Sequence, residues 1–181
     1  MHPFRTKILR NIAVFIVFAI LTLALSACAK GTPEPSLTIT IGDQSIKPIH
    51  CGDRYNESRE DIERFLKFPF ENASWEELSY VALGEEVIIE ATNFDTELFT
   101  VEDAILKQDG TFKYGEQSTT VYDVEVVDGI AKFQIPDHFG TSLSSNTEDY
   151  KPGRTIRAFV LRAKIDKADF VFAFVIRTNA D

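Results

Sequence analysis

The chain has 181 residues, which is enough for one ordinary domain beyond a targeting segment, and 44% of them are apolar, which is enough to build a core. Its formal net charge is -9. Three of the 19 basic residues precede Cys28, where no acidic residue occurs, so the remainder carries 16 basic residues against 28 acidic ones, a net charge of -12. Nucleic acid and anionic headgroups repel such a domain, so we expect no nucleic-acid partner.

The first 29 residues have the layout of an export signal. A basic start, "MHPFRTKILRN", is followed by an apolar stretch and then by small residues that end at a cysteine. The uncharged run from Ile12 to Ala29 has 18 residues, just long enough for a marginal membrane-spanning helix, so an uncleaved signal anchor stays open as an alternative. In both cases the basic start stays in the cytoplasm, and residues 30–181 lie outside the cytoplasmic membrane.

The four residues Leu25-Ser26-Ala27-Cys28 resemble the bacterial lipobox, in which Leu, a small residue, and Gly or Ala precede an obligatory Cys. The resemblance implies that residues 1–27 are a lipoprotein signal peptide, cut between Ala27 and Cys28, and that the Cys28 thiol carries a diacylglyceryl group. Two acyl chains, at ~0.8 kcal/mol per buried methylene, would anchor the protein firmly. Residues 28–36 then form a spacer of about 25 Å at most. We therefore expect a domain held by lipid on the extracytoplasmic side of a bacterial cell membrane.

From residue 37 to residue 181 the sequence predicts a single β-rich domain. "LTITI" alternates apolar and polar residues as a half-buried strand does, and in "SIKPIH" Pro48 predicts an edge strand or an early end. The last predicted strand, "DFVFAFVIR", is apolar on both faces, which predicts burial on both sides. Asp128-Gly129 is a strong signal for a two-residue hairpin. In all, strands are expected at residues 37–41, 45–50, 86–91, 98–106, 118–127, 130–135, 155–165 and 169–177.

One helix is expected within "ESREDIERFLKF", residues 57–68. Ile62, Phe65 and Leu66 form one apolar face, Ser58 is placed to cap the first turn, and Pro69 ends the helix. With about seven short strands, the pattern predicts a mainly β fold, an antiparallel β-sandwich of immunoglobulin-like architecture with one short inserted helix. A partly open β-barrel is the alternative.

The longest segment without predicted regular structure, Pro136–Gly153, is the candidate binding loop. Loops of this length are uncommon inside compact domains and are often functional. The alternative is a long crossover connection without a ligand. We expect this loop to bind a protein, a peptide or a glycan through Asp137, His138, Phe139, Glu148, Asp149 and Tyr150.

The sequence "IHCGD" places His50 beside Cys51. Neighbouring residues of a strand point to opposite faces, so a buried, inert thiol is the simplest interpretation, with a redox-sensitive or intermolecular thiol as another. The sequence has no zinc-spaced cysteine pair, no phosphate loop and no G-x-S-x-G elbow, so we expect no metal and no cofactor. A non-enzymatic binding module is the leading hypothesis. The alternatives are a thiol-dependent enzyme that uses Cys51 with His50 or His138, and a structural or quality-control component of the envelope.

Mass spectrometry of the mature N-terminus tests the lipoprotein prediction. The wild-type protein should begin at Cys28 and carry the mass of a diacylglyceryl group, whereas the Cys28→Ala variant should carry none. A wild-type protein that begins at an unmodified Met1 would show that the leader is a signal anchor.

Overall fold

The computed structural model describes residues 33–53, 57–165 and 168–180. The predicted signal peptide, residues 1–27, and the predicted lipid attachment site, Cys28, lie outside the described residues. Within the described part of the chain, no helix combines the length and the apolar content needed to cross a membrane.

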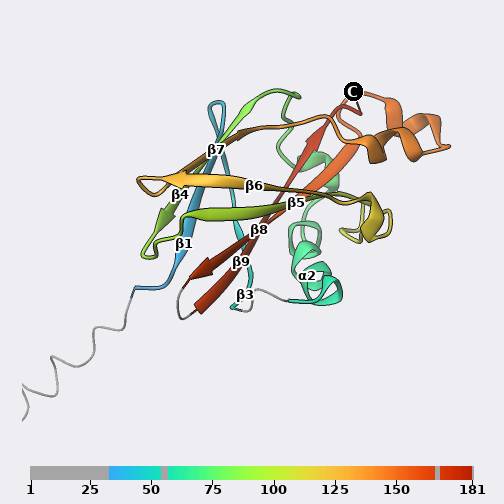
Figure 1. Cartoon of the computed structure of the whole chain (residues 1–181). Helices are drawn as coiled ribbons and strands as arrows, with labels where there is room; N and C mark the ends of the chain where they lie inside the picture. The colour runs from blue at the N-terminus through green and yellow to red at the C-terminus, as the bar shows by residue number, and fades with distance from the viewer. Residues whose placement is uncertain (1–32, 54–56, 166–167, 181) are drawn as a thin grey trace, which may run out of the picture. The chain divides into compact units, whose positions relative to one another are not determined.

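The protein is mainly β, as predicted, and its strands form one antiparallel sheet (Figure 1). The sheet has nine strands among the described residues, in the order β2-β1-β4-β7-β6-β5-β8-β9-β3. Seven of the eight predicted strands match observed ones to within two residues at each end. The strands are β1 (Ser36–Ile41), β2 (Gln44–Ile46), β3 (Ile49–Gly52), β4 (Glu86–Thr92), β5 (Leu98–Leu106), β6 (Thr120–Val127), β7 (Ile130–Gln134), β8 (Thr155–Ile165) and β9 (Ala168–Thr178).

The two edge strands of this sheet are consecutive in the chain. Only Lys47 and Pro48 separate β2 from β3, although seven other strands lie between them in the sheet. Two linking residues span at most about 11 Å, so the opposite edges must approach each other and the sheet must curl. The predicted strand at residues 45–50 therefore ends early at Pro48, as expected, and continues as the opposite edge.

The curled sheet resembles half of a barrel. β6 joins its two parts, because residues 120–125 pair with β5 whereas Val126 and Val127 pair with β7. The antiparallel, mainly β architecture is confirmed, but a sandwich of two separate sheets and an immunoglobulin-like fold are not. The physical reason is the short link between the edges, which favours the curled arrangement.

Two hydrophobic cores lie on opposite faces of β8 and β9. The inner core fills the concave side of the sheet and receives Phe172, Phe174 and Ile176 from β9. The outer core receives Val171, Ala173 and Val175 from the same strand. β9 is thus buried on both faces, as its sequence predicted.

A helical layer covers the outer core. It consists of α2 (Arg59–Leu66) and the short 3-10 helices η2 (Phe68–Phe70) and η3 (Trp75–Glu77). α2 begins as predicted, since the Ser58 hydroxyl accepts a hydrogen bond from the Asp61 amide at 3.1 Å. Its residues Ile62 and Leu66 are buried against the sheet.

The N-terminal end of the sheet and the start of the candidate binding loop lie at opposite ends of β4. Ser36, the first residue of β1, pairs with Thr92 at one end of β4. Gln134, two residues before the loop begins at Pro136, pairs with Glu86 at the other end. Six steps along a strand span about 20 Å, so the loop leaves the sheet far from the point where the sheet begins.

Candidate functional site

The candidate binding loop, Pro136–Gly153, is more regular than the sequence predicts. It contains two 3-10 helices, η5 (Phe139–Leu143) and η6 (Thr147–Tyr150). The Asn146 side chain caps η6 by accepting a hydrogen bond from the Glu148 amide at 3.2 Å. The Tyr150 hydroxyl lies 2.7 Å from the carbonyl oxygen of Ser144. The loop therefore presents a defined surface.

His138 holds the loop against the sheet. Its side chain is 2% exposed, and its Nδ1 accepts a hydrogen bond from the Gly140 amide at 3.1 Å. The proton of the neutral ring is then on Nε2, which lies 3.0 Å from the carbonyl oxygen of Asp103 and donates to it. The sequence suggested His138 as a ligand contact, but burial makes it an anchoring residue that is not available at the surface.

A buried ion pair fixes the start of the loop. Asp103 and Arg157 are both 0% exposed. Arg157 donates from Nε to Asp103 Oδ1 at 3.1 Å and from Nη2 to Oδ2, while its Nη1 donates to the carbonyl oxygen of Pro136 at 2.7 Å. Burial raises the pKa of the Asp103 carboxyl, and the hydrogen bonds from Arg157 oppose that shift. We call Asp103, Arg157 and His138 the loop anchor.

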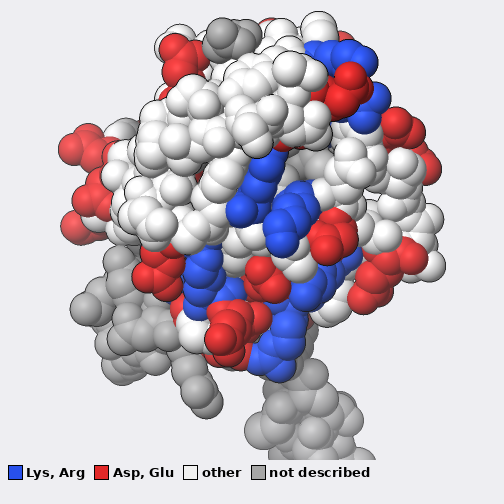
Figure 2. All heavy atoms as spheres, turned by 90° about the vertical axis from the view of Figure 1, so that its right-hand side faces the viewer, with Lys and Arg blue, Asp and Glu red and all other residues white. Residues whose placement is uncertain are grey.

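A cleft of about 590 Å³ lies between the loop and the segment that follows β5. Ile105, Leu106 and Ile156 provide its apolar part. Figure 2 shows Lys and Arg side chains gathered, together with acidic ones, on the face of the molecule that lies to the right in Figure 1. The charged residues that line the cleft are Lys107, Asp109, Lys113, Glu148, Asp149 and Arg154.

The acidic side chains of the cleft have partners. Lys113 Nζ lies 2.6 Å from Asp149 Oδ2, and Lys151 Nζ lies 2.7 Å from Glu148 Oε2. Burial disfavours the charged form of Asp149, but hydrogen bonds from Lys113 and Ser144 outweigh it and hold its pKa below the usual value. The hydrogen bond from Lys151 likewise lowers the pKa of Glu148. Both carboxylates are therefore ionised at neutral pH.

The six candidate residues of the loop fall into three groups. His138 is buried in the loop anchor, whereas Glu148 and Asp149 line the cleft. Phe139 and Tyr150 are 54% and 43% exposed, and Asp137 is exposed as well. Sequence reasoning missed Leu143, which is 51% exposed and adds a third large apolar side chain to the loop surface.

Sequence reasoning also missed the far wall of the cleft. The segment after β5 contributes Lys107, Lys113 and Tyr114, and Arg154 directly precedes β8. No spacing pattern joins these positions to the loop. Only the pairing of β5 with β8 brings them to one place.

Cys51 is not placed to act as a nucleophile. It is 0% exposed within the outer core, and burial raises the pKa of its thiol to about 12. His50 lies on the other face of β3, where its ring stacks on Phe172 at 5.1 Å and its Nε2 lies 2.9 Å from Asp53. The geometry fits a buried, inert thiol and removes the support for a thiol-dependent enzyme.

Among the described residues, no three His, Cys, Asp or Glu side chains come close enough together to hold a metal ion. No protein-family model matches the chain, and no curated protein is similar enough to indicate a relative. The case for a function therefore rests on the geometry of the cleft and its loop.

Alkylation by iodoacetamide tests the state of Cys51. In the Cys28→Ala variant, where Cys51 is the single cysteine, native protein at pH 8 should react very slowly, because a pKa of about 12 leaves roughly one thiolate in ten thousand. Unfolding in guanidinium chloride should restore the rate of a free cysteine. Rapid, stoichiometric labelling of the native protein would instead return the thiol enzyme to consideration.

Substitution of Asp103 tests the loop anchor. Asp103→Ala should lower the free energy of unfolding by about 3–5 kcal/mol in urea titrations, because it leaves the Arg157 guanidinium buried without a counter-charge. The double variant Asp103→Leu with Arg157→Met should lose less free energy of unfolding than Asp103→Leu and Arg157→Met lose together as single variants. Lys132→Ala, which removes an exposed pair with Glu86, is the control and should cost less than about 1 kcal/mol. Equal losses for Asp103→Ala and Lys132→Ala would show that the buried pair does not hold the loop.

Proposed function

We propose that the protein is a lipid-anchored lipoprotein of the bacterial envelope and that its exported domain is a non-enzymatic binding module. The cleft under the loop is the ligand site, and the ligand is a protein, a peptide or a glycan. The observation that carries this proposal is the cleft itself, whose volume of about 590 Å³ lies in the range typical of ligand sites. The protein is attached to the membrane through the covalent lipid on Cys28, and no cofactor takes part.

The position of the cleft supports this function. The candidate binding loop starts at the end of β4 that is distant from Ser36, the last residue of the proposed spacer. A domain tethered through Ser36 can therefore turn its loop away from the bilayer.

The surface of the loop also supports binding. Phe139, Leu143 and Tyr150 are all more than 40% exposed, although they are large and partly or wholly apolar. Aromatic side chains of this kind provide much of the contact energy in protein interfaces. Since the loop anchor fixes the backbone beneath them, a partner would meet a surface that is already ordered, and binding would cost little conformational entropy.

Site-specific photo-crosslinking tests the proposal. A benzophenone amino acid placed at Phe139 should give adducts with envelope components when intact cells are irradiated. Val127 is the matched control, because it is 65% exposed and lies at the hairpin between β6 and β7, at the N-terminal end of the sheet. Adducts from Val127 alone, or equally from both positions, would refute a binding role for the loop.

A further inference from the structure

In the cleft, the negatively charged groups have partners within the fold, whereas some of the positively charged groups have none among the described residues. All three carboxylates are engaged: Asp149 by Lys113, Glu148 by Lys151, and Asp109 by the amide and hydroxyl of Thr111, at 2.9 and 2.7 Å. The acceptor capacity of the cleft is thus largely used within the fold.

Two cations of the same cleft lack such partners. Among the residues that the structure describes, Lys107 Nζ makes no ion pair and no hydrogen bond, and its charge acts on Asp109 only through space. The Arg154 guanidinium stacks on the Trp75 ring, 4.8 Å from its centroid, and donates no hydrogen bond within the described part of the chain.

We propose that the cleft recognises an oxyanion of its ligand, a carboxylate or a phosphate group, through Lys107 and Arg154. The inference rests on the proposed function of the cleft and names the chemistry of its ligand. The two cations have only hydrogen atoms to offer, so they match an acceptor that has only lone pairs. The flat guanidinium of Arg154 can donate two parallel hydrogen bonds to such a group, and stacking on Trp75 holds it in place.

Charge distribution explains how an acidic domain can bind an anion. The residues from Cys28 onward carry a net charge of -12, so the average surface repels anions. Lys107, Lys113 and Arg154 meet in the cleft, and Lys113 already neutralises Asp149 there. Binding therefore depends on short-range contacts with these particular groups, and a lysine elsewhere cannot replace them.

Calorimetric titration of the full-length protein, purified in detergent, tests the inference. The probes are glucose, glucuronate and glucose 6-phosphate, which share one ring and differ in charge. At least one of the two anions should bind at least about tenfold more tightly than glucose, because each charge-assisted hydrogen bond strengthens binding. The anion that binds identifies the group as carboxylate or phosphate, and binding of both supports the inference equally.

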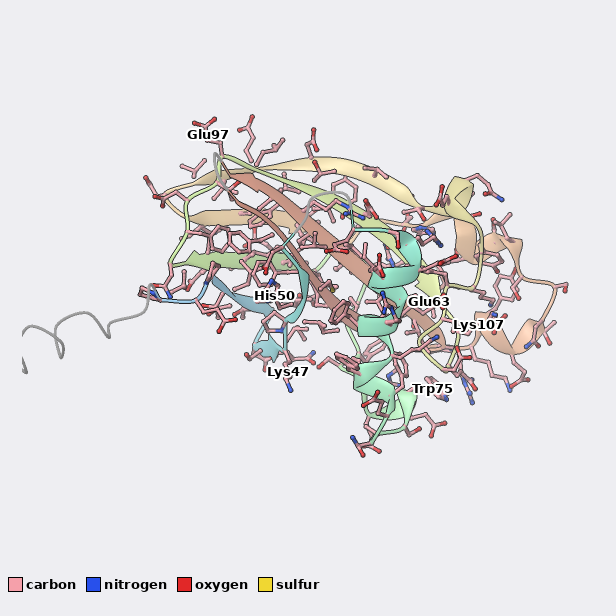
Figure 3. The ribbon with its side chains drawn as sticks, turned by 90° about the horizontal axis from the view of Figure 1, so that it is seen from below. Lys47, His50, Glu63, Trp75, Glu97 and Lys107 are labelled. Atoms are coloured by element: carbon pink, nitrogen blue, oxygen red, sulfur yellow. The ribbon has the colours of Figure 1, made fainter. Side chains whose placement is uncertain are left out.

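Two variants and a matched control locate the binding. Lys107→Gln should weaken binding of the anion about tenfold, whereas Lys47→Gln, which removes the same charge at an exposed position on the other side of α2, should leave it unchanged (Figure 3). Arg154→Gln should also weaken binding of the anion about tenfold, because the glutamine amide carries no charge and cannot donate the two parallel hydrogen bonds of a guanidinium.

The outcomes separate this inference from the proposed function. Failure of both anions to bind, equal binding of glucose and the anions, or equal effects of Lys47→Gln and Lys107→Gln would overturn the oxyanion site. An Arg154→Gln variant with unchanged affinity would overturn the role of the guanidinium. None of these results alters the crosslinking from Phe139, which tests the loop as a binding surface independently of ligand charge.

Discussion

The guanidinium of Arg157 is enclosed in the protein interior, and a buried charge is stable only where a counter-charge and enough acceptors surround it. Asp103 provides the counter-charge, and the carbonyl oxygen of Pro136 provides a further acceptor. That carbonyl belongs to the first residue of the candidate binding loop. The contacts that stabilise the charge of Arg157 therefore also fix the place where the loop leaves the sheet. His138 adds a second connection, since its Nε2 bonds to the backbone of Asp103. The cleft is therefore formed before any ligand arrives.

This arrangement depends on the curl of the sheet. Arg157 and Asp103 lie on the same concave face as the inner core, where Phe159 stacks on Phe174 at 4.8 Å. The Arg157 guanidinium lies over the Phe159 ring, 5.1 Å from its centroid, and so packs at the polar edge of that core. In a flat sheet the same face would be open to water, and the ion pair would contribute little. The short link between β2 and β3 thus has a consequence at a distant place, since it helps to enclose the charges that hold the loop.

Local patterns in the sequence were sufficient for most elements but not for their arrangement. β5 begins and ends at the predicted residues, Leu98 and Leu106, because alternation of apolar side chains is a local property. The two faces of β9 were likewise evident from its sequence. The curl of the sheet was not evident from the sequence. It arises because the short link at Pro48 joins strands at opposite edges, and only the order of all nine strands shows which strands those are. The burial of Asp103 was not evident from the sequence either, since its partner Arg157 lies 54 residues further along the chain.

The residues that hold the candidate binding loop against the sheet are largely different from the residues that a partner can reach. His138 and Arg157 act on backbone groups of the loop, namely the Gly140 amide and the Pro136 carbonyl. The anchoring contacts are therefore largely independent of the side chains at the loop surface. Phe139 can change in size and polarity without loss of these anchoring contacts, whereas Tyr150 also holds the loop through the hydrogen bond from its hydroxyl to the carbonyl oxygen of Ser144. A sequence alone does not reveal this division, because His138 and Phe139 are adjacent and equally plausible as contact residues. It follows that the chemistry of the surface can diverge while the cleft beneath it keeps its shape, which suits a fold whose task is recognition.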